Sequence, residues 1–159
     1  MTWRIRISFF LVLLLLPWGV FFFSQVWRVD NLSCESKYEV ARFTGNQYLR
    51  SMGTLSADFS LNNKVLIRYV GELEVDGQLY SVHRAAELNY EFQGGYVKYA
   101  TVEVSTSFSD NAPDELVFAH VNPSFKKGDV TYSYGYRLGP SIWGVGFKDS
   151  PRAVCKLQF

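Results

Sequence analysis

The chain has 159 residues, of which 48% are hydrophobic and 17% aromatic, a length that suits one domain behind an N-terminal segment and argues against a two-domain enzyme. Residues 28–159 hold 14 of the 16 basic residues and all 15 acidic ones, so their formal charge is −1. A domain with this balance lacks the basic surface that neutralises nucleic-acid phosphates. We therefore expect no direct contact with nucleic acid.

The first predicted element is an apolar N-terminal helix. Residues 7–27 contain no charged side chain, and Arg4 and Arg6 precede them. About 20 apolar residues span a bilayer as a helix, and basic residues before the span hold the N-terminus in the cytoplasm. A cleaved signal peptide would need small residues at its cleavage site, whereas residues 21–27 read FFFSQVW. The sequence predicts a cytoplasmic N-terminus at 1–6, a retained transmembrane anchor at 7–27 and an exported domain at 28–159.

The exported part contains both cysteines, Cys34 and Cys155. An oxidising compartment favours a disulfide between them, and closing so long a loop stabilises a fold by about 4–5 kcal/mol in the chain-entropy model. Two separate buried thiols are the alternative. A zinc site needs three or four convergent ligands, and these cysteines have no C-x-x-C spacing and no neighbouring histidine.

From Cys34 onward the hydrophobic pattern has a period of two and is rich in tyrosine and β-branched residues, which is typical of half-buried strands. The first four strands are predicted at 34–43, 50–61, 64–75 and 78–92. Asn62-Asn63 and Asp76-Gly77 are two-residue hairpin turns that take positive φ. Arg84 interrupts the apolar face of the fourth strand.

Gly94-Gly95 forms the next turn, and a fifth strand is predicted at 96–108. Pro113 suits the first turn of a helix, and Asp114 and Glu115 complement its dipole, so residues 113–120 are predicted as a short helix. Three more strands follow at 130–138, 141–148 and 153–159. Cys34 therefore opens the first strand, and Cys155 lies in the last.

Eight consecutive antiparallel strands form a meander. If the first and last strands meet, the sheet closes into a small up-and-down, lipocalin-like barrel without free edges, and the disulfide fixes its seam. A sheet that closes incompletely and is completed by a strand of another protein fits the same periodicity.

Few residues indicate chemistry. His83 falls in a strand and His120 after the short helix, and neither belongs to a motif, so both are interpreted as structural or surface residues. Asp110, Asp114 and Glu115 share one loop, and we interpret them as a solvated cap of the short helix, since the spacing of a calcium loop is missing. The sequence predicts no catalytic residue, metal or cofactor.

Six aromatic residues are candidates for the lining of an apolar ligand cavity inside the barrel. An eight-stranded barrel is just wide enough to be filled by its own side chains, so the same residues could instead form a packed core. The set comprises Tyr69, Tyr90, Tyr132, Tyr134, Tyr136 and Trp143.

The sequence combines a basic N-terminus, a single span, Cys34 in the segment NLSCE, a tyrosine-rich meander and Cys155 in the segment VCK. In this combination it resembles the FidL-like family of enterobacterial inner-membrane proteins, and within that family the accessory proteins of fimbrial operons. The resemblance implies a non-enzymatic accessory regulator with a ToxS-like role. Its periplasmic domain would stabilise or switch a ToxR-like membrane transcription regulator. The cysteine pair is the only site that carries over. The alternatives are a membrane-anchored, lipocalin-like barrel that binds a small apolar ligand, and a fimbrial assembly factor that offers a strand edge.

Overall fold

The computed structural model describes residues 14–21, 33–44, 47–60, 62–139, 142–148 and 150–158. Residues 14–21 are helical, and the rest of the predicted anchor at 7–27 and the predicted cytoplasmic residues 1–6 lie outside the described residues. Among the helices that are described, none combines the length and the hydrophobicity required to cross a membrane.

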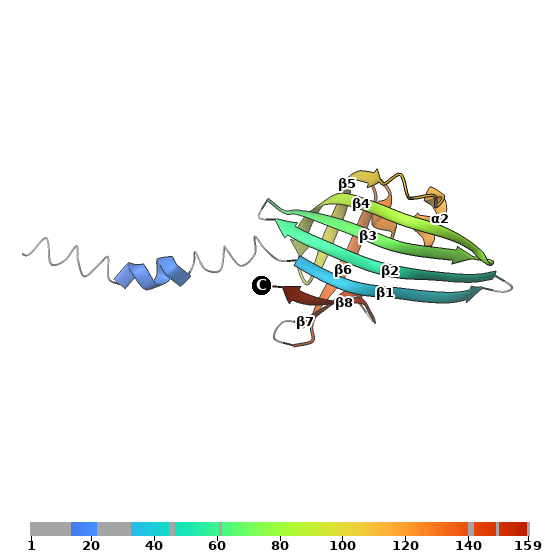
Figure 1. Cartoon of the computed structure of the whole chain (residues 1–159). Helices are drawn as coiled ribbons and strands as arrows, with labels where there is room; N and C mark the ends of the chain where they lie inside the picture. Colours follow the sequence, from blue (N-terminus) through green and yellow to red (C-terminus); the bar gives the residue numbers. More distant parts are fainter. Residues whose placement is uncertain are drawn as a thin grey trace, which may run out of the picture.

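Eight antiparallel strands form a closed barrel in which each strand pairs with the next and the last pairs with the first (Figure 1). The predicted mainly-β meander with eight strands and one short helix is confirmed. The strands are β1 (Ser33–Thr44), β2 (Gln47–Ser60), β3 (Lys64–Val75), β4 (Gln78–Gln93), β5 (Tyr96–Thr106), β6 (Val130–Arg137), β7 (Ile142–Phe147) and β8 (Ser150–Gln158).

The predicted turn at Asp76-Gly77 has positive φ at both residues, whereas in the turn at Asn62-Asn63 only Asn63 has positive φ. Asn63, Asp76 and Gly77 adopt φ angles of 58°, 52° and 82°. Two-residue turns with positive φ match the right-handed twist of the flanking strands. Local sequence therefore determines where β2 turns into β3 and where β3 turns into β4.

Two strands begin three residues earlier than predicted: β2 begins at Gln47 rather than at 50, and β8 begins at Ser150 rather than at 153. The additional residues of β8 include Pro151, although proline cannot donate a ladder hydrogen bond. In the structure Pro151 is paired with Gly146, where the register between β7 and β8 shifts. Such irregularities are positions at which a strand tolerates proline.

The connection between β5 and β6 contains α2 (Asp114–His120) and the 3₁₀ helix η1 (Pro123–Phe125). Val117, Val121 and Phe125 are buried and belong to the same hydrophobic core as the inner faces of the long strands. The Tyr38 hydroxyl of β1 donates to the Val121 carbonyl at 3.0 Å, and the Thr101 hydroxyl of β5 donates to the Ser124 carbonyl at 2.9 Å. The helical connection thus fills the barrel between β1 and β5.

The barrel is closed mainly at the end where β1 begins. β1 and β8 pair over three residues, Ser33 to Glu35 with Lys156 to Gln158, and β5 pairs with β6 over four. β1 to β4 are longer than β6 to β8 and extend beyond them, and α2 lies near this extended end (Figure 1). The interior consequently has a strand-enclosed half and a half filled by α2 and η1.

Candidate functional site

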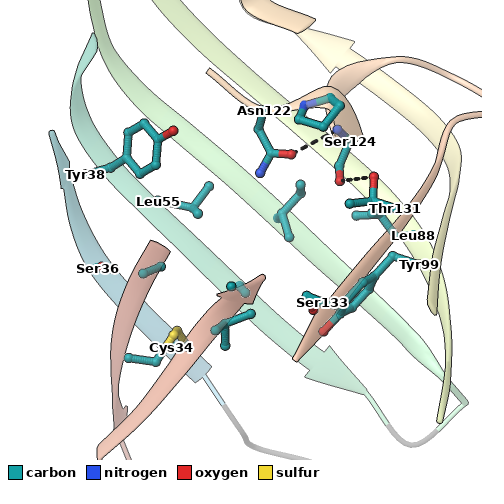
Figure 2. Close-up of a pocket in the computed structure, with 18 of the residues that line it drawn as sticks. Cys34, Ser36, Tyr38, Leu55, Leu88, Tyr99, Asn122, Ser124, Thr131 and Ser133 are labelled. Atoms are coloured by element: carbon teal, nitrogen blue, oxygen red, sulfur yellow. Dashed lines mark hydrogen bonds between the residues drawn. A yellow bond between two sulfur atoms is a disulfide. The ribbon is translucent and has the colours of Figure 1, made fainter. Parts of the chain in front are cut away.

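The strand-enclosed half of the barrel contains a cavity of about 180 Å³ (Figure 2). Much of its wall is aliphatic or aromatic and comes from the inner faces of β2, β3 and β4, which contribute Leu55, Ala57, Phe59, Val65, Ile67 and Leu88. A concave, mostly apolar space with a few polar groups is the usual form of a small-molecule site, so this cavity is the first candidate for a binding site.

One side of the cavity is polar and is built from the link between α2 and η1. Asn122 precedes η1, and its side-chain oxygen accepts a hydrogen bond from the Ser124 backbone N–H at 2.9 Å. The Ser124 hydroxyl donates to the Thr131 hydroxyl at 3.3 Å, which donates to the Asp129 carboxylate at 3.0 Å. With its oxygen bound in this way, the Asn122 amide nitrogen faces the cavity (Figure 2).

A second polar group comes from β5 and β6. Burial raises the pKa of Tyr99, and the nearby Ser133 hydroxyl lowers it by less, so the phenol stays neutral at physiological pH. The Ser133 oxygen is buried, and no partner in the described structure reaches it with normal hydrogen-bond geometry. Tyr99 and Ser133 point toward the same part of the cavity (Figure 2).

Among the described residues, the side chains in the cavity wall are all uncharged. Transferring an ion into such surroundings without a charged partner is strongly unfavourable. The geometry therefore suits a neutral occupant that is mostly apolar and makes one or two hydrogen bonds.

The predicted disulfide is confirmed and forms part of this wall. Cys34 of β1 and Cys155 of β8 are bonded, with their Cα atoms 5.0 Å apart, and both are buried. Cys155 is also the register partner of Trp143 in β7. The cross-link thus joins the first and last strands at the seam and borders the cavity.

The six aromatic residues predicted to line a cavity lie in different places. Tyr69 and Tyr90 are buried in the packed core, whereas Tyr132 contributes to the cavity wall although 48% of it is exposed. The wall does not include Tyr134, Tyr136 or Trp143.

The difference arises because β6 presents Thr131 and Ser133 to the interior. Tyr132 and Tyr134 instead contact Tyr96, with ring centroids 5.6 and 6.0 Å apart. The sequence prediction assigned the aromatic face of this strand to the interior and thereby missed Ser133. The alternation of Thr131 and Ser133 with the tyrosines is the signal that could have indicated it. Tyr99, on β5, was not among the predicted lining residues.

Within the acidic loop, Asp110 is buried and so does not belong to the solvated cap that the sequence suggested. Arg84 points into the barrel, and its guanidinium binds Asp110 at 3.0 and 3.2 Å, Asp114 at 2.6 Å and the Ala112 carbonyl at 2.7 Å. The side chains of Arg84 and Asp110 are only 2% and 4% exposed. Burial alone would raise the pKa of Asp110, but hydrogen bonds from Arg84 and from two backbone N–H groups lower it below its ordinary value. Asp114 and Glu115 are both exposed and fit the expectation, and the Asp114 side chain is 63% exposed although it binds Arg84.

Across the described residues, no group of three or more histidine, cysteine, aspartate or glutamate side chains is arranged to hold a metal ion. The backbone N–H of His83 donates to Asp110 at 2.9 Å. His120 ends α2, and its buried Nδ1 has no hydrogen-bond partner among the residues that the structure describes. Burial lowers the pKa of His120, and the nearby positive charge of Arg42 lowers it further.

A second feature with binding potential is the edge of β1. Beyond Glu35, no described strand pairs with β1 on the side away from β2, so residues 36–44 form an edge (Figure 1). Alternate backbone N–H and C=O groups along such an edge are available to another strand. The outward side chains Lys37 and Glu39 carry opposite charges.

Comparison with known proteins assigns no family to the chain. No protein-family model matches it, and no curated protein has a significantly similar sequence. The resemblance to the FidL-like family stays a prediction.

Proposed function

We propose that the chain is a non-enzymatic accessory regulator anchored in the bacterial inner membrane by residues 7–27. Residues 1–6 lie in the cytoplasm and the barrel in the periplasm, where it binds a ToxR-like membrane transcription regulator and stabilises or switches it. The result is expression of fimbrial adhesin and virulence genes. The resemblance described above supports this proposal, and the edge of β1 is the observation that carries it.

The edge supports partner binding because nine residues of β1, from Ser36 to Thr44, lack a second neighbouring strand in the described structure. Proteins normally protect edges of this length with bulges, prolines or covering segments. β1 pairs with β2 in unbroken register from Ser33 to Thr44 and contains no proline. A strand of a partner protein that pairs with this edge would continue the sheet.

The disulfide and the proposed anchor fit the same proposal. Disulfides persist in the periplasm and are rare in the cytoplasm. Two proteins anchored in one membrane have a high effective concentration, so a short strand contact with modest intrinsic affinity suffices for association.

A photo-crosslinking experiment tests the contact. A benzophenone amino acid at Ala41, on the outer face of the edge strand, should crosslink the full-length protein to a membrane regulator in cells. The matched control is Ala85, which also faces outward but lies on β4, a strand paired on both sides. Equal crosslinking from both positions, or none from Ala41, contradicts the proposal.

Deletion of residues 28–159 tests the consequence. The regulator should become less abundant or less active, while its DNA-binding domain stays intact. If regulator level, dimerisation and target transcription are all unchanged, the accessory role is wrong. Capture of fimbrial subunits in place of a regulator would favour an assembly factor.

The retained anchor has its own test. Protein purified from native membranes should have a mass that begins at Met1. A mass that begins near residue 25 would show a cleaved signal peptide and remove the anchor.

The cavity favours a second candidate function, in which the lipocalin-like barrel binds a small apolar molecule. This activity is compatible with partner binding, because the cavity lies inside the barrel and the proposed partner contact lies along the edge of β1.

A further inference from the structure

We infer that the cavity binds a neutral molecule about the size of one aromatic ring with a short substituent, which carries a hydrogen-bond acceptor such as a ketone oxygen. The inference rests on the second candidate function above and is independent of the regulator. It specifies the size, the charge and the polar group of the ligand.

The size follows from the volume. An engineered apolar cavity of about 150 Å³ in another protein binds benzene. The cavity of about 180 Å³ in this barrel is slightly larger. A single ring with two or three additional heavy atoms therefore fits.

The apolar part of the ligand is inferred from the side chains that form the cavity wall. Leu55, Ile67 and Leu88 line one side of the cavity, and Val145 and Ala153 line the seam side. Burial of a hydrocarbon surface between them is favourable, and the absence of any charged side chain among the lining residues disfavours an ionised ligand.

The acceptor follows from Asn122 and Ser133. The orientation of the Asn122 amide is defined, because its oxygen must accept from the Ser124 N–H and its two amide hydrogens then remain for the cavity. The Ser133 hydroxyl is buried beside Tyr99, and within the described structure it makes no hydrogen bond of normal geometry. A carbonyl oxygen of a ligand accepts from such donors, whereas a hydrocarbon leaves them unsatisfied.

The binding test uses the full-length protein in lipid nanodiscs and fluorine NMR. 4-Fluoroacetophenone should show saturable binding above that of empty nanodiscs. 4-Fluorocumene has the same shape without the oxygen and should bind about 2- to 10-fold more weakly, the ratio expected for one hydrogen bond. 4-Fluorobenzoate, which is charged at neutral pH, should not bind.

Two substitutions locate the site. Ala57→Phe places a ring inside the cavity and should abolish binding of the ketone. Ala41→Phe, the same change on the outer face of β1, should leave binding at the level of the unaltered protein. If Ala57→Phe does not fold, Ala153→Leu fills the opposite wall and should weaken binding of both fluorinated probes.

A third substitution tests the polar group. Asn122→Asp keeps an oxygen for the Ser124 N–H but replaces the amide donor by an acceptor. This variant should bind 4-fluoroacetophenone more weakly than 4-fluorophenol, because the phenol donates a hydrogen bond. The order of the two affinities is therefore the reverse of that in the unaltered protein. An unchanged order contradicts the role of Asn122.

The inference is wrong if the unaltered protein shows no saturable binding, or if the cavity-filling variants bind the ketone as well as the control does. No regulator is present in these assays. A negative result in the binding assays therefore does not contradict the proposed partner contact at β1. A negative result in the crosslinking experiment likewise does not contradict the ligand site.

Discussion

Arg84 is a cation inside a barrel whose inner face is otherwise largely apolar at this level, with Val82 and Ala86 on either side of it in β4. A buried ion pair gains little net stability when its desolvation is counted, but removal of one partner leaves an uncompensated charge. Arg84 holds Asp110, Ala112 and Asp114 together, so it connects β4 to the loop that leads into α2. The main structural role of Arg84 is therefore to fix the position of this loop.

We expect Arg84→Met to lower the free energy of unfolding by about 3–5 kcal/mol, since Asp110 would remain buried without its cation. Urea denaturation followed by circular dichroism measures the change. The control is Arg68→Met, which removes an exposed ion pair with Asp58 and should have almost no effect. Similar losses from both variants would show that burial does not decide the outcome.

His120 gives the barrel a dependence on pH. Burial and then Arg42 hold its pKa below the ordinary value of 6.5, so the unfolded chain takes up the proton more readily than the folded one. The stabilisation by neutral His120 is complete above about pH 6.5 and is lost as the pH falls below that value. The free energy of unfolding should therefore decrease between about pH 7 and pH 5, and His120→Gln should reduce the slope. The same substitution at His83 is the control, and equal slopes in all three proteins would contradict this role.

At the scale of elements, the pairing of β2 with β3 depends on two facing glycines. Gly53 and Gly71 are register partners, and the fully buried Tyr69 lies against them while its hydroxyl shares a hydrogen bond of 2.8 Å with Ser51. The ring of Tyr38 meets Tyr69 edge-on at 5.9 Å. The absence of side chains at the two glycines leaves the space in which Tyr69 fits.

Gly71→Ala should destabilise the barrel by about 1–3 kcal/mol, the usual cost of overpacking. Its Cβ would meet the Met52 carbonyl oxygen and lie 2.6 Å from the Gly53 Cα, both of them backbone atoms. Gly135→Ala is the control, because the nearest atom, in Trp143, is 3.7 Å away. Thermal unfolding should show a lower melting temperature for the Gly71 variant alone, and a matching loss for Gly135 would refute the steric explanation.

At the scale of the whole molecule, closure of the barrel combines a short ladder with a long covalent loop. Three residue pairs join β1 to β8, and the disulfide connects cysteines 121 residues apart. The chain-entropy model assigns a cross-link of this span about 4–5 kcal/mol. The seam therefore owes much of its stability to the disulfide.

Replacement of both cysteines by alanine, which avoids a free thiol, should lower the melting temperature and increase protease cleavage near β1 and β8. Limited proteolysis with mass spectrometry locates the cuts. A double variant as stable and as resistant as the unaltered protein would contradict a structural role, as would free thiols at Cys34 and Cys155 in protein isolated from an oxidising compartment.

The sequence by itself determined the eight strands, their antiparallel order, the short helix and the cysteine pair, because alternation, positive-φ turns and the number of cysteines are local or countable properties. Asn63, Asp76 and Gly77 are examples in which local conformation is sufficient. The tertiary structure decided which face of β6 points inward, since tyrosine packs on either side of a sheet and only curvature and register select one. It also decided the burial of Asp110, the position of the cavity and the length of the seam, because each depends on contacts between residues far apart in the chain.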